Sequence, residues 1–159
     1  MFLKACLNNY NPNQNTSVDE AMVAFRGRLG FRQYLPAKPT KYGVKVWMRA
    51  DPINGYVNDF QVYIGREERA KPETGLATRV VLDLTRHIWN RNHIVNMDNY
   101  FTSPDLLDKL LRNGTYGRGT IRPNRKQYPS NLFKKKDLVK RRDYKTAPRC
   151  EMLACTWMD

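Results

Sequence analysis

Long apolar runs are missing from this 159-residue chain. No window approaches the roughly 18 uninterrupted apolar residues of a membrane-spanning helix, and the N-terminal run MFLKACLNNY is too polar and too short for a signal peptide. Cysteine is scarce, since 3 residues are fewer than a secreted disulfide scaffold needs and their number is odd. These absences predict a soluble intracellular protein with reduced thiols.

Residues that would ligate zinc or build a hydrolase triad are also rare. Cys150 and Cys155 have no second cysteine or histidine pair near them, so a zinc site is disfavoured and two small buried side chains on a strand are expected. His87 and His93 lack partners at ligand spacing and are interpreted as structural. The chain has no Ser-His-Asp set, Walker loop or glycine-rich dinucleotide turn, which leaves triad hydrolases, ATPases and Rossmann enzymes without support.

Apolar and aromatic residues are nevertheless abundant enough to build a folded core, at 41% and 11% of the chain. A chain of this length is expected to form one compact domain, with or without a tail. Trp47, Trp89 and Trp157 lie in apolar runs and are expected in the core.

Basic residues exceed acidic ones by 28 to 15, which gives a net charge of +13. A surplus of this size suggests a polyanionic partner, nucleic acid first. The charge is uneven, at +5 over residues 1–58, −2 over residues 59–108 and +10 over residues 109–159. An acidic centre between basic ends suits an enzyme that holds cations while it cuts a phosphodiester. A solvated basic surface explains the same charges equally well.

The first half of the chain predicts an antiparallel meander. A polar lead-in over residues 1–16 precedes a strand that begins near Ser17. On that strand Asp19 shares a face with the apolar Val23 and Phe25, an unusual position for an acid. The runs YGVKVWMRAD and GYVNDFQVYIG are rich in β-branched and aromatic residues and flank a turn, so they predict a hairpin beside the first strand.

The second half predicts two helices that alternate with strands. A helical apolar period is followed by a short interior strand over residues 93–97, parallel to an earlier strand. A second helix has Pro104 at its first position and Gly114 as its terminator. A strand over residues 116–122 then leads into a basic, irregular stretch and a final apolar run. This order is the opening of a ribonuclease H-like α/β fold, with a mixed sheet and flanking helices.

Two carboxylates stand out by their position. Asp19 lies on an early strand and Asp98 ends the strand after the first helix. Ligand sites of open α/β sheets form beyond such strand ends. Mg²⁺ would remove the repulsion between two converging carboxylates, and acids that hold hard divalent ions are the core of two-metal phosphoryl chemistry. Spacing alone favours the alternative, in which Asp98 merely ends a strand and Asp19 pairs with an arginine.

Six motifs follow one another along the chain: SVDEAMVAFRGR, QYLPAKPTKYGVKVW, GYVNDFQVYIG, VVLDL, NMDNYFTSPDLLDKL and GTIRPNRK. In this order they resemble the transposase domain of the piggyBac family and its domesticated derivatives. The resemblance implies that Asp19 and Asp98 are the first two members of a three-aspartate centre that binds two Mg²⁺ or Mn²⁺ ions. It also implies cut-and-paste DNA transposition at TTAA targets, a nuclear location and room for a homodimer in the longer parent protein.

The resemblance also has gaps. The family's third aspartate lies beyond an insertion domain that follows the strand near Arg122, and this sequence stops inside that insertion. We therefore expect a truncated, partial catalytic domain over residues 17–122, the basic start of an insertion domain over residues 123–159, and no strand transfer by this fragment alone. The alternative is a domesticated, non-catalytic DNA-binding or protein-interaction module.

Basic residues of the GTIRPNRK motif are the candidate DNA contacts. By resemblance, Arg122, Arg125 and Lys126 lie close to the scissile phosphate, and we expect them to clamp backbone phosphates. The basic residues between positions 134 and 142 extend the same field, although a solvated loop is the alternative. Beside Asp98, the aromatic pair Tyr100 and Phe101 suits core packing better than base stacking.

Overall fold

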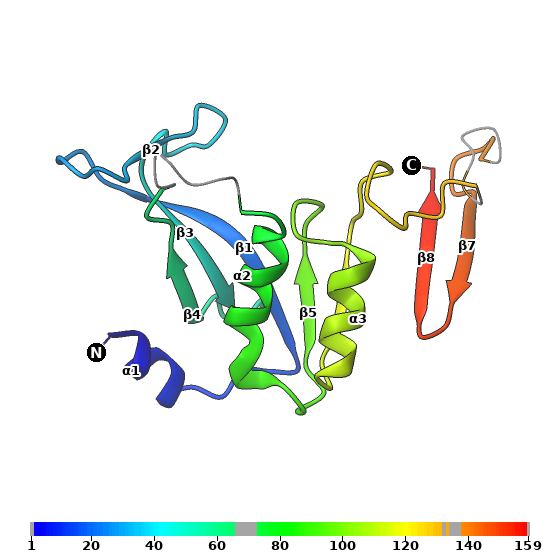
Figure 1. The fold of residues 1–159 in the computed structure, drawn as a ribbon, viewed down its shortest axis with the longest axis horizontal. Helices are drawn as coiled ribbons and strands as arrows, with labels where there is room; N and C mark the ends of the chain where they lie inside the picture. Colours follow the sequence, from blue (N-terminus) through cyan, green and yellow to red (C-terminus); the bar gives the residue numbers. More distant parts are fainter. Residues whose placement is uncertain (1, 66–72, 132, 134–137, 159) are drawn as a thin grey trace. The chain divides into compact units, whose positions relative to one another are not determined.

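The computed structural model describes residues 2–65, 73–131, 133 and 138–158, and its contacts divide the chain into two units, Met1–Thr120 and Ile121–Asp159. The first unit contains α1 (Phe2–Asn8), β1 (Asn15–Ala24), β2 (Gln33–Tyr34), β3 (Tyr42–Ala50), β4 (Val57–Val62), α2 (Leu76–Thr85), the 3₁₀ helix η1 (Arg86–Ile88), β5 (Ile94–Met97), α3 (Pro104–Arg112) and β6 (Tyr116–Gly119) (Figure 1). The second contains β7 (Tyr144–Arg149) and β8 (Met152–Trp157). Within the described ranges, no helix is long and apolar enough to cross a bilayer.

The sheet of the first unit is mixed, and β1 is its central strand. β1 runs antiparallel to β3 along residues 17–24 and parallel to β5 along residues 15–18. β4 is antiparallel to β3, β6 is parallel to β5, and the short β2 also pairs with β3. The predicted meander, the parallel interior strand and the ribonuclease H-like order are therefore confirmed.

The two longer helices cover one face of this sheet (Figure 1). Their apolar residues recur at helical spacing and meet alternate residues of the strands, which makes the core. The buried core residues are Val18, Trp47, Val80, Val81, Leu84, Ile88, Val95, Met97, Phe101, Leu106 and Leu110. The opposite face, called the open face below, carries Asp19 and Val23 of β1, and Val23 is 53% exposed. Phe25, expected on the same face, lies one residue beyond the end of β1 and is 38% exposed.

The ends of α3 follow from local chemistry. The Ser103 hydroxyl accepts a hydrogen bond from the Leu106 N–H at 3.3 Å, which caps the first turn. Pro104 occupies the first helical position, where no N–H partner is needed. Gly114 follows the helix with φ 58°, the left-handed conformation that ends many helices. This helix was predicted from the same residues.

The polar lead-in is tied to the sheet by Asp51, which is fully buried at the end of β3. Its Oδ2 accepts hydrogen bonds of 2.9 Å from the Tyr10 hydroxyl and from both the backbone N–H and the Nδ2 of Asn13. Its Oδ1 accepts from the Ile53 N–H, also at 2.9 Å. Burial by itself would raise the pKa of the Asp51 carboxyl, but these hydrogen bonds lower the pKa to about 2.

The second unit corrects three expectations. β7 forms a hairpin with β8 inside the stretch expected to be irregular, because its polar residues and Pro148 conceal a strand that has a partner on one side only. Cys150 lies in the hairpin turn with φ 49°, and both Cys150 and Cys155 are exposed rather than buried. Trp157 is 56% exposed, since a two-stranded hairpin has no second layer of its own to cover it.

Candidate active site

The register of β1 and β5 brings the two candidate aspartates to the same end of the sheet. Val18 pairs with Met97 in parallel register, so Asp19 and Asp98 are the next residues on two neighbouring strands. Adjacent strands lie about 4.8 Å apart, and successive side chains point to opposite faces. Val18 and Met97 are buried under the helices, whereas Asp19 and Asp98 are exposed. Asp19 therefore points to the open face, and Asp98 is exposed directly after the end of β5 beside it.

One oxygen of each carboxylate is held by nearby backbone. Asp19 Oδ1 accepts from the Glu20 N–H at 2.7 Å. Asp98 Oδ1 accepts from the Tyr100 N–H at 2.9 Å and from the Phe101 N–H at 3.4 Å. In the part of the chain that the structure describes, neither Oδ2 takes part in a hydrogen bond or ion pair, and Asp19 makes no ion pair with an arginine. One oxygen of each aspartate remains available to a ligand.

This donor set fits a hard divalent cation. Mg²⁺ and Mn²⁺ prefer oxygen ligands, and Mg²⁺ commonly uses one or two carboxylates with water or substrate oxygens in its remaining positions. The exposure of Asp19 and Asp98 leaves space for such oxygens. Within the described ranges there is no group of three or more His, Cys, Asp or Glu residues that could hold a metal. The two aspartates are therefore a partial ligand set.

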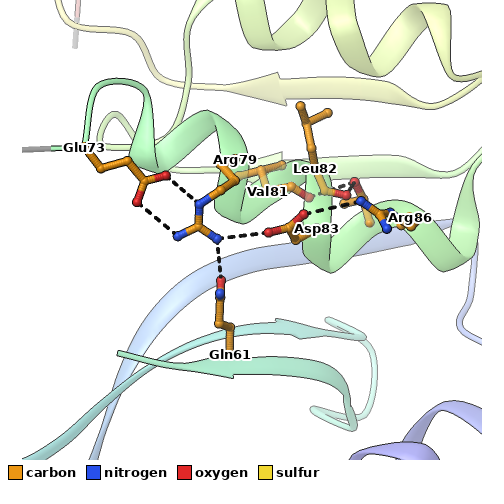
Figure 2. Close-up of polar contacts among 8 residues, drawn as sticks. Gln61, Glu73, Arg79, Val81, Leu82, Asp83 and Arg86 are labelled. Atoms are coloured by element: carbon orange, nitrogen blue, oxygen red, sulfur yellow. Dashed lines mark hydrogen bonds and ion pairs between the residues drawn. The ribbon is translucent and has the colours of Figure 1, made fainter. Parts of the chain in front are cut away.

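Two acids from the middle of the sequence, Glu73 and Asp83, are engaged by one arginine. Figure 2 shows the Arg79 guanidinium on α2 between two carboxylates and an amide. Its Nε lies 2.6 Å from Glu73 Oε1, and its Nη1 lies 3.0 Å from Asp83 Oδ2 and 3.4 Å from Gln61 Oε1. These contacts tie α2 to β4.

A basic residue on the open face was not singled out from the sequence. Arg118 on β6 is aligned with Asn96 on β5, two positions before the row that contains Asp98. Its Nε donates to Asn96 Oδ1 and its Nη2 donates to Asn15 Oδ1 at 3.2 Å. Both acceptors are neutral amides, so these contacts leave the guanidinium charge unneutralised, on the side of Asn15, four positions before Asp19 on β1. Period-two alternation along β6 was the signal that could have revealed it.

The predicted phosphate-clamping residues belong to the second unit. Arg122 and Lys126 are exposed and Arg125 is half-buried, and the Arg125 N–H donates to the Arg122 carbonyl at 3.1 Å within a turn. Lys140, at the far end of the same basic stretch, is exposed, whereas positions 134–137 lie outside the described residues. The role of these side chains in DNA binding stays a prediction.

Several residues weighed in the sequence have structural roles. Phe101 is 1% exposed in the core, and Tyr100 packs edge-on against it with ring centroids 4.9 Å apart, as the core interpretation predicts. His93 is buried, and its Nδ1 lies 3.0 Å from the Asn13 carbonyl oxygen. Trp47 is a core residue, and Trp89 is half-buried, with its indole N–H donating to Thr85 Oγ1 at 3.2 Å.

Comparisons with known proteins place this arrangement in a family. All of residues 1–159 match a family model described as "Transposase IS4". Human PiggyBac transposable element-derived protein 3 is 33% identical over 93% of this chain and 26% of its own length, and human PiggyBac transposable element-derived protein 2 is 28% identical over 90% of this chain and 25% of its own length. The chain thus spans about a quarter of these curated relatives.

A solved structure carries the same fold. The cryo-EM structure of a piggyBac transposase synaptic complex with hairpin DNA superposes with a TM-score of 0.86 and 28% sequence identity, over 98% of this chain and 33% of that one. Sequence and fold agree with the resemblance drawn from the motifs. This chain belongs to the piggyBac transposase family.

Proposed function

We propose that this chain supplies the first two carboxylate ligands of a divalent-metal centre that cleaves and joins DNA strands in piggyBac-type transposition. The observation that carries the proposal is the parallel register of Val18 with Met97, which makes Asp19 and Asp98 neighbours across β1 and the end of β5. Mg²⁺ or Mn²⁺ bound there would supply a nucleophile and stabilise the leaving oxygen.

Backbone groups of this chain orient the two carboxylates that would bind the metal ion. The N–H groups of Glu20 and Tyr100 fix one oxygen of each aspartate, so the other oxygen of each carboxylate is presented to the cation. Two carboxylates leave much of a two-metal cage to other donors. We therefore expect no strand transfer by the 159-residue chain alone, because Asp19 and Asp98 are only part of such a cage.

The nucleic-acid partner is double-stranded DNA at transposon ends. The excess of +10 over residues 109–159 supports this, because phosphate neutralisation dominates protein affinity for DNA. Arg122, Arg125 and Lys126 contact the backbone and position the duplex. A TTAA target, a homodimer of the parent protein and a nuclear location belong to the same proposal. The relative solved in a synaptic complex with hairpin DNA supports DNA as the partner.

Titration with Mn²⁺, followed by the electron paramagnetic resonance signal of the free ion, tests the metal site. We expect the unmodified chain to bind Mn²⁺, and Asp19→Asn and Asp98→Asn each to weaken binding by about tenfold or more, because each removes a charged ligand. Asp105→Asn is the matched control, since Asp105 is an exposed acid on α3 whose carboxylate pairs with Lys109. Absence of binding by the unmodified chain would favour the non-catalytic DNA-binding or protein-interaction module.

A further inference from the structure

Lys45 on β3 is enclosed on the helix-covered side of the sheet. Its ammonium lies 5.5 Å from the ring centroid of Trp47, 5.8 Å from that of Tyr63 and 5.7 Å from that of Tyr100. It also lies 2.6 Å from Glu20 Oε2, and 16% of the Lys45 side chain is exposed. Three aromatic faces and one carboxylate compensate the loss of water around this charge.

Two of these partners are the residues that hold the candidate metal ligands. The backbone N–H of Glu20 donates to Asp19 Oδ1 at 2.7 Å. The backbone N–H of Tyr100 donates to Asp98 Oδ1 at 2.9 Å. The ammonium of Lys45 therefore contacts, from the opposite side of the sheet, both residues whose backbones orient the two aspartates.

We propose that Lys45 is a positioning residue for the metal site. It fixes Glu20 by an ion pair and Tyr100 by a cation–π contact, and their N–H groups in turn set the orientation of the Asp19 and Asp98 carboxylates. The inference rests on the proposed function of those carboxylates as metal ligands. Removal of groups that orient metal ligands typically lowers metal affinity by about 10- to 100-fold.

Lys38 provides a matched comparison. Its ammonium lies 3.3 Å from Glu20 Oε1, and its side chain is 37% exposed. In the described part of the chain it makes no cation–π contact. Lys38→Met therefore removes the same charge from the same carboxylate but leaves the contact with Tyr100 intact.

The core should tolerate the loss of the Lys45 charge. Trp47 and Tyr63 contact each other edge-on, with ring centroids 5.2 Å apart, and this contact does not need the ammonium. A methionine at position 45 fills similar space with an unbranched apolar chain. Lys45→Arg keeps the charge and can stack on the rings, so it should restore part of the lost function.

The test compares Lys45→Met, Lys45→Arg and Lys38→Met in two measurements, Mn²⁺ affinity and amide hydrogen exchange of Glu20 and Tyr100 by NMR. We expect Lys45→Met to weaken Mn²⁺ binding by about tenfold and to speed exchange of both amides. We expect Lys38→Met to leave both measurements close to those of the unmodified chain. Lys45→Arg should lie between the two.

The outcomes separate this inference from the proposed function. If the unmodified chain binds Mn²⁺ and Lys45→Met binds it equally well, Lys45 has no positioning role while the metal site stands. If the unmodified chain binds no Mn²⁺, the proposed function fails, and unchanged exchange at Glu20 and Tyr100 in Lys45→Met overturns the inference independently. Should Lys45→Met not fold, Glu20→Gln removes the ion pair but keeps the contact between Lys45 and Tyr100. It is expected to weaken Mn²⁺ binding by less than Lys45→Met and to speed exchange of the Glu20 amide alone, and unchanged values of both would overturn the inference.

Discussion

Val18 of β1 and Met97 of β5 stand opposite each other in parallel register, and the residue that follows each of them is an aspartate. The two buried apolar residues hold the strands together under α2 and α3. The two aspartates that follow them are exposed to solvent. A stable core pair thus determines where two charged residues, 79 positions apart in the sequence, come together.

The 159-residue chain should not cut DNA by itself. Purified protein incubated with a labelled transposon end and Mg²⁺ is expected to produce no 3′-end nicks, because Asp19 and Asp98 supply only part of a two-metal ligand set. Gel analysis of the labelled strand gives the measurement. A clean nick that disappears in Asp98→Asn would contradict this expectation.

Arg122 and Arg125 should contribute to DNA affinity through phosphate contacts. Replacing both by Ala is expected to weaken duplex binding for all sequences alike and to reduce the slope of log affinity against log salt by about two, one for each lost phosphate contact. Fluorescence anisotropy at several salt concentrations measures the slope. Arg91→Ala, at an exposed position of the first unit, is the control. An unchanged slope in the double variant would remove the clamp hypothesis.

Asp51 should make the free energy of unfolding depend on pH in the acid range. Its folded-state pKa, about 2, lies below the ordinary value of 3.8. A depressed folded-state pKa stabilises the fold above the unfolded-state value, and this contribution is lost as pH falls from about 4 towards 2. Asp51→Asn should cost on the order of 2 kcal/mol at neutral pH, since it weakens hydrogen bonds to a charged acceptor.

Urea unfolding at several pH values between 5 and 2 measures this effect. The Asp51→Asn variant should show a flatter decline in the free energy of unfolding than the unmodified chain. Asp105→Asn, which changes an exposed carboxylate on α3, is the control. Equal pH dependence of the Asp51 variant and the unmodified chain would show that the carboxylate does not anchor the lead-in.

Gly119 on β6 should not accept a side chain. A Cβ at this position would overlap the carbonyl oxygen of Met97 and the hydroxyl of Thr102, the residues that bracket the Asp98 turn. Gly119→Ala is therefore expected to lower the free energy of unfolding by about 1–3 kcal/mol and to weaken Mn²⁺ binding. Thermal unfolding and Mn²⁺ titration check both effects. Gly30→Ala, where a Cβ would meet nothing within 4 Å, should change neither.

Local signals in the sequence were sufficient for much of the fold. Ser103, Pro104 and Gly114 define the ends of α3 through interactions within a few residues, so the sequence predicted that helix. Strand residues with β-branched and aromatic side chains likewise predicted β3 and β4. The family motifs around Asp19 and Asp98 made these two acids the candidate metal ligands, and that role stays a prediction.

Only the tertiary structure determined which residues of distant segments lie beside one another. The alignment of Asp19 with Asp98 depends on the register of β1 and β5, and the enclosure of Lys45 depends on Tyr63 and Tyr100 arriving from distant parts of the chain. A lysine in a strand beside Trp47 was a weak hint of this. The exposure of Trp157 could not be predicted from the sequence either, because the burial of a strand residue depends on whether a second layer covers the strand. Short-range preferences choose an element, whereas long-range pairing and packing determine its neighbours.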